Sequence, residues 1–400
     1  MALSEYLLEL FLSRADQLAK DLEAARSIAE SLKELVEGLW AARTPKAPGP
    51  HGVSAVDGGS NFLELKWQAL YAVVGYGMEG DGAREHWIGD VGLLSVQDVA
   101  DFVRTLREIC ELKAALSLRA RPIIIDGSVT PLLVDPSPLA RRATLAEAFK
   151  ITAKVLGEEA VDEVWRGLQE QRRRLRDSAR FLGEPFIARA LVRNTREGAD
   201  VVFPFLLLVE RLLALRMLLE EAGTEAGDVP GVAFLSKSSR GRQYCERIDA
   251  CRAHPLLSDS TVFELATRRS GYSSPVRVPE EGVIKAMPRE GALGELVRDF
   301  FEEVGIYASY VRLIDDGPVL RLELAVRGGG PKDVARSIEA LMDVLAGSSY
   351  EGYPYPLIVA DRKARVERDA LLRLAWSLGS VVPMTGREVL GEWLRMPEGA

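Results

Sequence analysis

Apolar residues recur at three- and four-residue steps from Leu3 to about Trp40, a spacing that predicts an amphipathic helix or a pair of helices. The Thr44–Gly52 stretch that follows holds three prolines and two glycines and therefore predicts a linker. A helical arm of this kind serves internal packing, a dimer or a partner, and its pattern does not choose between these roles.

The pattern changes after the linker. Val53–Asp57 is a short apolar run, and Trp67–Tyr76 and His86–Leu94 are rich in aromatic and β-branched residues, so the three segments predict adjacent strands. Apolar positions within Val99–Cys110 follow one face of a helix. The continuous apolar run Pro122–Asp126 is typical of a central strand that is buried on both faces.

Helical periodicity dominates residues 139–222 and predicts a helical insertion or cap. Farther on, Ile306–Ile314 and Val319–Val326 flank the turn sequence DDGP and predict a hairpin. The apolar segment Pro356–Ala360 predicts a last strand, and a long helix is expected to follow it from about residue 361 to residue 378.

A chain of 400 residues exceeds the roughly 250–300 residues at which a single core usually splits, so more than one structural unit is expected. The order of elements predicts an α/β protein. Its expected parts are an N-terminal helical arm at 1–44, the first part of the core at 45–138, the helical insertion or cap at 139–230, and the second part of the core with a C-terminal helix at 231–400.

Composition narrows the functional classes. The formal charge is 51 − 59 = −8, which argues against a protein that coats nucleic acid with its whole surface but leaves room for a local basic channel. The three cysteines, Cys110, Cys245 and Cys251, include no CxxC pair and predict neither a disulfide framework nor a zinc site. A reducing cytoplasm fits this sparse set best.

The most apolar long stretch, Phe203–Leu219, contains Glu210, Arg211 and Arg216. A bilayer-spanning helix rarely tolerates such charges, so this segment predicts a buried or interface helix. Near the N-terminus no small-residue cleavage site follows an apolar run, so we expect neither export nor membrane insertion.

Two apolar strands end in Asp-Gly, at Asp57 and at Asp126. A single Asp-Gly usually marks a turn, but two of them, each closing an apolar strand, favour a shared acidic pocket if the strands are neighbours. Repulsion between the two carboxylates would be relieved by a hard divalent cation with oxygen ligands, Mg²⁺ or Mn²⁺.

Further carboxylates are available in the same pattern. Glu108 and Glu111 lie on the intervening helix, and because neither is on its apolar stripe, a solvated face stays open for both. Asp361 stands where the last strand is expected to meet the last helix, so it is either a helix N-cap or another metal ligand.

Positive charge gathers in two segments. Residues 235–252 carry 5 − 2 = +3, including Lys237, Arg240 and Arg242, and residues 166–180 carry 6 − 2 = +4. Either segment could line a channel for one DNA strand, with Tyr244 or Tyr272 offering a stacking surface. For residues 166–180 an exposed helix face with ordinary intrahelical ion pairs is an equally good interpretation.

The order of strands and carboxylates is the plan of the ribonuclease H-like nucleases, and the chain resembles the NurA family, nucleases that work with the HerA translocase in DNA end processing. The matching segments are AVDGGS at 55–60, IIIDGS at 123–128, VAFLSKSSR at 232–240, LSDSTVFE at 257–264, VLRLEL at 319–324 and GYPYPLIVADRKARV at 352–366.

This resemblance implies a ribonuclease H-like mixed sheet core, a homodimeric ring or clamp, a HerA-type hexameric ATPase as partner, and manganese dependence. It also implies 5′-to-3′ exonuclease and single-strand endonuclease action on DNA in double-strand break end resection. The family's functional residues match Asp57, Asp126, Glu111 with Glu108 as fallback, Lys237 and Tyr353.

One position departs from the family pattern. Where the family commonly has histidine, this sequence has Asp361, which is still an oxygen ligand but cannot serve as a histidine does near neutral pH. The expected chemistry is metal-assisted phosphodiester hydrolysis, with Lys237 offsetting charge on the scissile phosphate. Arg240 and Arg242 are the further candidates for DNA contact.

Two other functions stay open at this point. A non-catalytic adaptor that keeps the fold and clamps DNA or an ATPase would explain Asp361. A ribonuclease H-like enzyme acting on RNA hybrids is the third interpretation. The adaptor predicts binding without hydrolysis, and substrate competition would separate the RNA enzyme from a DNA nuclease.

Overall fold

The structure, a computed structural model, describes residues 3–46, 52–65, 68–80, 82, 84–96, 98–254, 257–278 and 282–381. Residues 47–51 of the expected linker and Trp67 of the expected second strand lie outside the described residues.

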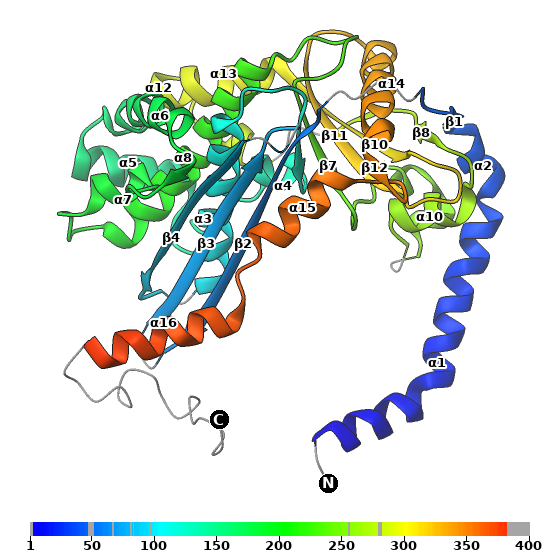
Figure 1. Cartoon of the computed structure of the whole chain (residues 1–400), viewed down its shortest axis with the longest axis horizontal. Coiled ribbons are helices and arrows are strands. Elements are labelled where there is room, and N and C mark those ends of the chain that lie inside the picture. Colours follow the sequence, from blue (N-terminus) through cyan, green and yellow to red (C-terminus); the bar gives the residue numbers. More distant parts are fainter. Residues whose placement is uncertain are drawn as a thin grey trace.

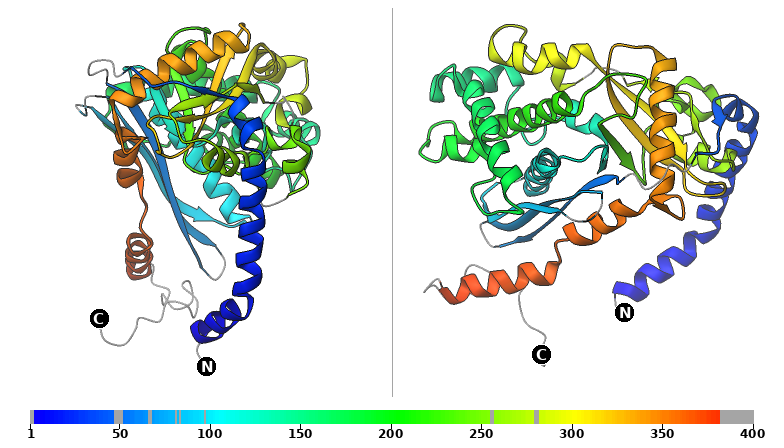
Figure 2. Two further views of the ribbon diagram at one scale, coloured as in Figure 1. Left: turned by 90° about the vertical axis from the view of Figure 1, so that its right-hand side faces the viewer. Right: turned by 45° about the horizontal axis from the view of Figure 1, so that its top comes forward.

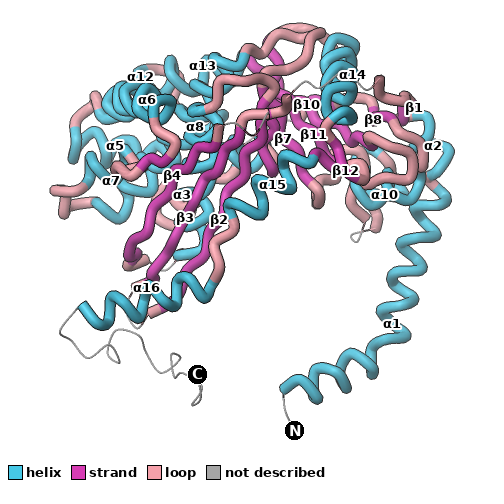
Figure 3. The backbone as a smooth tube through the Cα atoms, in the orientation of Figure 1, coloured by secondary structure: helices cyan, strands magenta, loops and turns pink. Residues whose placement is uncertain are grey.

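Eleven strands of the described chain form one mixed sheet (Figures 1 and 3). They are β1 (Trp40–Ala42), β2 (Ser54–Glu64), β3 (Ala69–Met78), β4 (Glu85–Leu94), β5 (Ile123–Asp126), β6 (Arg180–Phe181), β7 (Val232–Ser236), β8 (Gly271–Ser273), β9 (Val276–Arg277), β10 (Val304–Arg312) and β11 (Leu320–Arg327). The order across the sheet is β1-β8-β10-β11-β7-β5-β2-β3-β4-β6, with β9 paired to β10. The predicted α/β class and the β10–β11 hairpin are confirmed.

The middle of the sheet is parallel. β5 lies between β2 and β7 and runs parallel to both, whereas the strands outside these three are mostly antiparallel. The three isoleucines of β5 are at most 2% exposed, as expected for a central strand covered on both faces. β2 is longer than predicted, because it continues past the aspartate through GGSNFLE and pairs with β3 up to Glu64.

Helices cover both faces of the sheet beside β2 and β3 (Figure 2). α3 (Val99–Ser117) packs on one face, and α15 (Tyr355–Ala364) with α16 (Arg368–Val381) packs on the other. α14 (Pro331–Gly347) adds to the second layer, where its apolar side joins the hydrophobic cluster that contains α15.

The segment predicted to be helical between residues 139 and 222 forms four helices and only the two-residue strand β6. α8 is buried on nearly all sides and packs against α3, α5, α6 and α7, which confirms the buried helix expected at 203–219. No helix of the described chain combines the length and apolarity needed to cross a membrane. The four helices are α5 (Leu145–Leu156), α6 (Ala160–Asp177), α7 (Ile187–Val192) and α8 (Ala199–Ala222).

The predicted N-terminal helix pair is confirmed as α1 (Leu3–Ser31) and α2 (Lys33–Gly38). α1 extends away from the rest of the described chain (Figures 1 and 2), and its main contacts there are with α2, α9 (Asp249–Arg252) and α10 (Asp259–Ala266). Much of its apolar stripe, including Leu8, Phe11 and Leu22, is therefore exposed in a single chain.

The last predicted strand is wrong. Residues 356–360 belong to helix α15, and Asp361 lies inside this helix rather than at an N-cap. A short hairpin of β12 (Ser349–Tyr350) and β13 (Tyr353–Pro354) precedes it, and Pro356 stands in the first turn, where a missing backbone N–H costs nothing. The remaining elements are α4 (Val129–Val134), α11 (Val283–Ala286), α12 (Gly291–Leu293), α13 (Asp299–Glu303), a 3₁₀ turn at Cys245–Arg247 and a π-helical turn at Gly294–Arg298.

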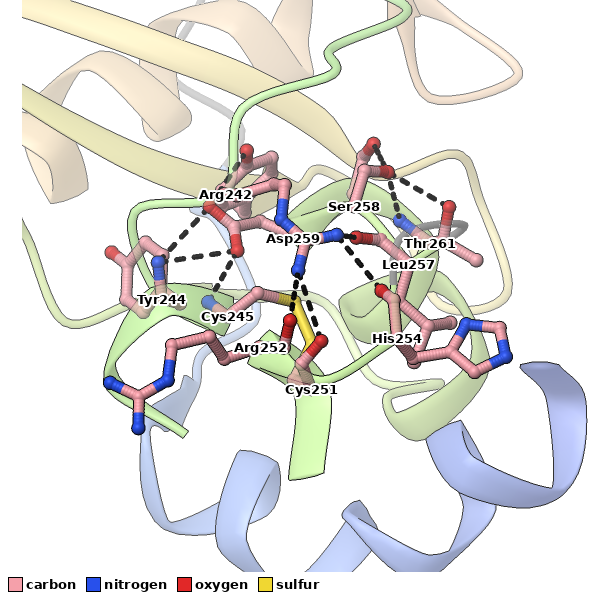
Figure 4. Close-up of a disulfide and its surroundings, with 12 residues drawn as sticks. Arg242, Tyr244, Cys245, Cys251, Arg252, His254, Leu257, Ser258, Asp259 and Thr261 are labelled. Atoms are coloured by element: carbon pink, nitrogen blue, oxygen red, sulfur yellow. Dashed lines mark hydrogen bonds between the residues drawn. A yellow bond between two sulfur atoms is a disulfide. The ribbon is translucent and has the colours of Figure 1, made fainter. Parts of the chain in front are cut away.

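The cysteine pattern predicted no disulfide framework, but Cys245 and Cys251 form one disulfide (Figure 4). Spacing along the sequence could not show this, since a disulfide depends on the fold bringing two Cα atoms together. Both cysteines belong to the hydrophobic cluster that also contains Leu32 and Val36, at the C-terminal end of the N-terminal helical arm. Cys110 is free and buried.

Candidate functional site

Asp57 and Asp126 lie side by side on two adjacent parallel strands, Asp57 within β2 and Asp126 at the end of β5. β2 and β5 pair in register up to Val56 and Ile125, and each aspartate is the next residue of its strand. Neighbouring strands are about 4.8 Å apart, so the two residues are adjacent. The residue two positions before each aspartate packs in the cluster that contains α15, and alternation along a strand turns both carboxylates to that side.

Glu111 of α3 approaches β2 from the other face of the sheet. A Cβ atom on Gly58 would lie 2.2 Å from Glu111 Oε1, so only glycine leaves room for that carboxylate. Gly59 points to the opposite face, where a Cβ would lie 1.7 Å from the carbonyl oxygen of Ala364 at the end of α15. The two glycines of DGGS thus admit one helix on each face of β2.

Three residues from the second half of the chain surround Asp126. Lys237 follows β7, with its Nζ 3.6 Å from Asp126 Oδ2 and 4.4 Å from the centre of the Tyr353 ring. The Tyr353 hydroxyl donates a hydrogen bond of 3.1 Å to the same Oδ2 atom. Asp361 on α15 adds a negative charge that acts on both Asp57 and Asp126, and it forms an ion pair of 3.6 Å with Arg365.

Burial raises the pKa of the Asp57, Glu111 and Asp126 carboxyl groups, and repulsion from neighbouring carboxylates adds to the effect. Burial, together with the charge of Asp126, raises the pKa of Asp57 to about 7, against a 2.7 Å hydrogen bond from the Gly58 amide. Burial raises the pKa of Glu111 to about 8, although Arg107 opposes the shift. Burial also raises the pKa of Asp126, with Lys237 and Tyr353 opposing. The cluster therefore carries more negative charge than its surroundings neutralise.

The donor set suits a hard divalent cation, although the side chains are not arranged around one. Within the described residues, no three His, Cys, Asp or Glu side chains stand in the geometry of a metal site. Three carboxylates are instead paired with basic side chains, as Glu111–Arg107, Asp126–Lys237 and Asp361–Arg365. All four candidate ligands offer carboxylate oxygens whose repulsion a cation would relieve, so their chemistry fits Mn²⁺ or Mg²⁺.

Glu108, the alternative to Glu111, has another partner. Its Oε2 accepts a 2.8 Å hydrogen bond from Arg211 of α8. Both glutamates are at most 9% exposed, although periodicity placed them off the apolar stripe of α3, because α8 and the sheet cover further faces of this helix. Only Glu111 contacts Gly58 of β2, so the geometry favours Glu111 as the ligand.

The other residues predicted to contact DNA differ in how exposed their side chains are. Arg240 is exposed shortly after Lys237. Tyr244 and Tyr272 are 5% and 7% exposed, so the expectation that they offer a stacking surface is wrong. Arg242 supports its own loop (Figure 4), since its guanidinium donates to the backbone carbonyls of Cys251, Arg252, His254 and Leu257.

Several arginines of helix α6 form ion pairs with carboxylates of the protein itself. Arg172 and Arg176 share the carboxylate of Glu221 on α8, and Arg174 pairs with Glu170 one turn earlier. The Arg174–Glu170 pair agrees with the exposed intrahelical ion pairs expected for residues 166–180, whereas Arg172 and Arg176 are held by the neighbouring helix α8.

Sequence reasoning missed Arg107, which lies on α3 one turn before Glu111 with its Nε 3.0 Å from Glu111 Oε1. The signal was present, because residues four apart on a helix are neighbours. Arg107, Glu111 and Asp126 line a cavity of about 240 Å³ together with Arg104 and Ser128.

Fold and site together define an α/β protein whose carboxylates gather around two adjacent aspartates of the central parallel strands. The NurA domain profile matches residues 51–366, and the chain belongs to the NurA family. It is 20% identical over 367 residues to the DNA double-strand break repair nuclease NurA of Sulfurisphaera tokodaii, covering 90% of this chain and 91% of that one.

Solved structures agree with the fold. The crystal structure of the NurA nuclease from Sulfolobus solfataricus matches with a TM-score of 0.63 at 20% identity, over 96% of this chain and 99% of that one. A crystal structure of NurA bound to dAMP and manganese matches with a TM-score of 0.70 at 13% identity, over the same shares.

Proposed function

We propose that this protein is a metal-dependent deoxyribonuclease that hydrolyses phosphodiester bonds. The observation that carries the proposal is the placement of Asp57 and Asp126 on adjacent parallel strands, with Glu111 of α3 packed against Gly58 and subject to the charges of both aspartates. Family membership supports it, because relatives bear the name DNA double-strand break repair nuclease.

Asp57, Glu111 and Asp126, with Asp361 beside them, would hold Mn²⁺ or Mg²⁺. The chemistry that such cations supply in phosphodiester hydrolysis is an activated water and stabilisation of the leaving oxygen. A manganese-bound NurA structure of the same fold supports this choice of cation.

Tyr353 and Lys237 have separate roles in this proposal. Burial raises the pKa of Tyr353, so its phenol keeps its proton and fixes the Asp126 carboxylate by donating to it. Lys237 is about half exposed over the Tyr353 ring, which leaves its ammonium group available to offset charge on the scissile phosphate. Arg240, exposed beyond it, would contact the DNA backbone.

Asp361 replaces the histidine that the family resemblance leads one to expect. Nearly half of its side chain is exposed, its partner is Arg365, and it lacks the imidazole that a histidine would offer for proton transfer. We assign it to cation binding.

The finer activities follow from the resemblance. We propose 5′-to-3′ exonuclease and single-strand endonuclease action in DNA double-strand break end resection, together with a HerA-type hexameric ATPase. A homodimer is also proposed, and here α1 gives support: Leu8, Phe11, Leu18 and Leu22 are 59, 57, 44 and 71% exposed along one helix that projects from the body. Such a stripe is stable in water when another apolar surface covers it.

Incubation of the purified protein with end-labelled single- and double-stranded DNA and Mn²⁺ tests the proposal. We expect cleavage that EDTA abolishes and that Asp57→Asn and Asp126→Asn each lower by at least about a thousandfold. Asp177→Asn, at an exposed aspartate at the end of α6, is the matched control and should cleave like the wild type.

The rival function is a non-catalytic clamp for DNA or an ATPase. Two observations favour it, namely Asp361 at the histidine position and the absence, within the described residues, of three side chains in metal-binding geometry. It predicts DNA binding without hydrolysis, and binding that survives Asp57→Asn together with Asp126→Asn.

A further inference from the structure

Arg107 makes few interactions with the carboxylates of the candidate site, although it lies beside them. Its Nε lies 3.0 Å from Glu111 Oε1, and within the described chain its guanidinium has no other ion pair and makes no hydrogen bond. The side chain is 35% exposed. Its two amino groups make no hydrogen bond to described protein atoms, and Arg107 lines the 240 Å³ cavity that Asp126 and Ser128 also line.

Arg104 provides the contrast on the same helix. It lines the same cavity three residues earlier, but its Nη2 donates to Asp135 at 2.7 Å and to Asp101 at 3.2 Å. Arg104 is therefore held by two carboxylates outside the candidate metal site, whereas Arg107 is held by one carboxylate inside it.

The charge around Arg107 shows what it does in the metal-free protein. Glu111 favours its charged form most, and Glu108, Asp57 and Asp126 add to the effect. Arg107 therefore acts as a counter-ion for the whole carboxylate cluster, in the place where a divalent cation would act.

Cations on these carboxylates would remove the attraction that holds Arg107 to Glu111. The guanidinium group presents a planar fork of N–H donors that matches phosphate oxygens, and Arg107 already lines the cavity. We propose that Arg107 exchanges partners, pairing with Glu111 in the metal-free protein and binding a DNA phosphate in this cavity once the carboxylates hold cations. This inference rests on the proposed nuclease function.

The first test measures Mn²⁺ binding by calorimetry without DNA. Arg107→Gln removes a cation that competes for Glu111, so we expect the dissociation constant for Mn²⁺ to fall severalfold. Arg107→Lys keeps the charge and should stay within about twofold of the wild type. Arg104→Gln, the matched control, should also stay within about twofold.

The second test measures single-turnover cleavage of single-stranded DNA with saturating Mn²⁺ at increasing enzyme concentration. For Arg107→Gln we expect the half-saturating concentration to rise about tenfold, because one charge-assisted contact to phosphate is lost. The maximal rate should change less than about threefold. The slope of log affinity against log salt should fall by about 0.7, the share of one phosphate on a single strand.

Arg107→Lys separates a specific role from a fold defect, since it should bind DNA between the wild type and Arg107→Gln. Tighter Mn²⁺ binding together with weaker DNA saturation in Arg107→Gln supports the exchange. Weaker Mn²⁺ binding would overturn it, because Arg107 would then only orient Glu111, and so would an unchanged DNA saturation. A wild type that binds no Mn²⁺ would refute the proposed function itself, which the calorimetry shows before any variant is made.

Discussion

Helix α3 carries two groups of charged side chains that differ in how they are neutralised. Toward α8, the Lys113 ammonium donates to Glu210, to Gln171 and to the carbonyl of Pro185. Toward β2 and β5, the ion-pair partner of Glu111 among the described residues is Arg107, and Asp57 accepts a hydrogen bond from the Gly58 amide while it faces the charges of Asp126 and Asp361. The first group is balanced and the second has surplus negative charge.

The difference separates structural charges from candidate functional ones. A buried ion pair with every hydrogen-bonding group satisfied fixes how two helices pack. Buried carboxylates that repel each other lower stability, and such clusters persist where an ion or substrate completes them. Glu108 and Glu111 are three residues apart, so a structural charge and a candidate functional charge lie within one turn of the same helix.

Lys113→Met should have the largest effect on stability. It leaves the Glu210 carboxylate, which is fully buried, without its cation, and breaking such a pair costs about 3–5 kcal/mol. Urea unfolding at pH 7 measures the loss. Adding Glu210→Gln should recover part of it, and a loss below about 1 kcal/mol for Lys113→Met would show that this pair is not balanced as described.

Glu108→Gln and Glu111→Gln should change stability in opposite directions. The first leaves Arg211 buried without its carboxylate and should cost about 2–3 kcal/mol. The second removes a buried charge that its neighbours repel, so the metal-free protein at pH 8 should gain about 1–2 kcal/mol. If both variants lost the same free energy of unfolding, the two groups of charges would not differ in how they are neutralised.

The surplus negative charge of the candidate site predicts how the stability of the protein depends on pH. The pKa of Asp57 is raised from 3.8 to about 7 and that of Glu111 from 4.5 to about 8, so between these limits the folded state binds more protons than the unfolded one. Stability of the metal-free protein should therefore be fully present below about pH 4 for these groups and fall as pH rises through 7 to 8. Thermal unfolding with EDTA at pH 5.5 and 8 checks this, and Asp57→Asn should flatten the difference.

Arg174→Ala should have the smallest effect. Arg174 and Glu170 are each 67% exposed, and an exposed pair at this spacing contributes at most about 0.5 kcal/mol. A larger loss by urea unfolding would mean that the charges of α6 belong with the balanced group.

Much of the core was predictable from local pattern. The β-branched run of β5, the spacing in α3 and the DDGP hairpin each follow from side-chain periodicity and turn chemistry, and the structure confirms them. The site aspartates were predictable because each follows a short apolar run, although only the fold shows that β2 continues past Asp57 and that β2 and β5 are neighbours.

The errors have physical causes. The segment PLIVA is apolar enough for a strand, and its helix depends on packing against β2 that short-range pattern does not contain. The pairing of Cys245 with Cys251 depends on the turn between them. Arg107 was overlooked because a lone arginine on a helix has many ordinary uses, and its free amino groups are visible only in three dimensions.

Mn²⁺ binding with proton release tests the central claim most directly. At pH 7 the carboxyl groups of Asp57 and Glu111 are partly protonated, so cations that bind them must displace protons, and the heat of binding should depend on the ionisation enthalpy of the buffer. We predict this dependence for the wild type and its loss, together with Mn²⁺ binding, in the Asp57→Asn, Asp126→Asn double variant. Equal Mn²⁺ affinity in both proteins would contradict the account.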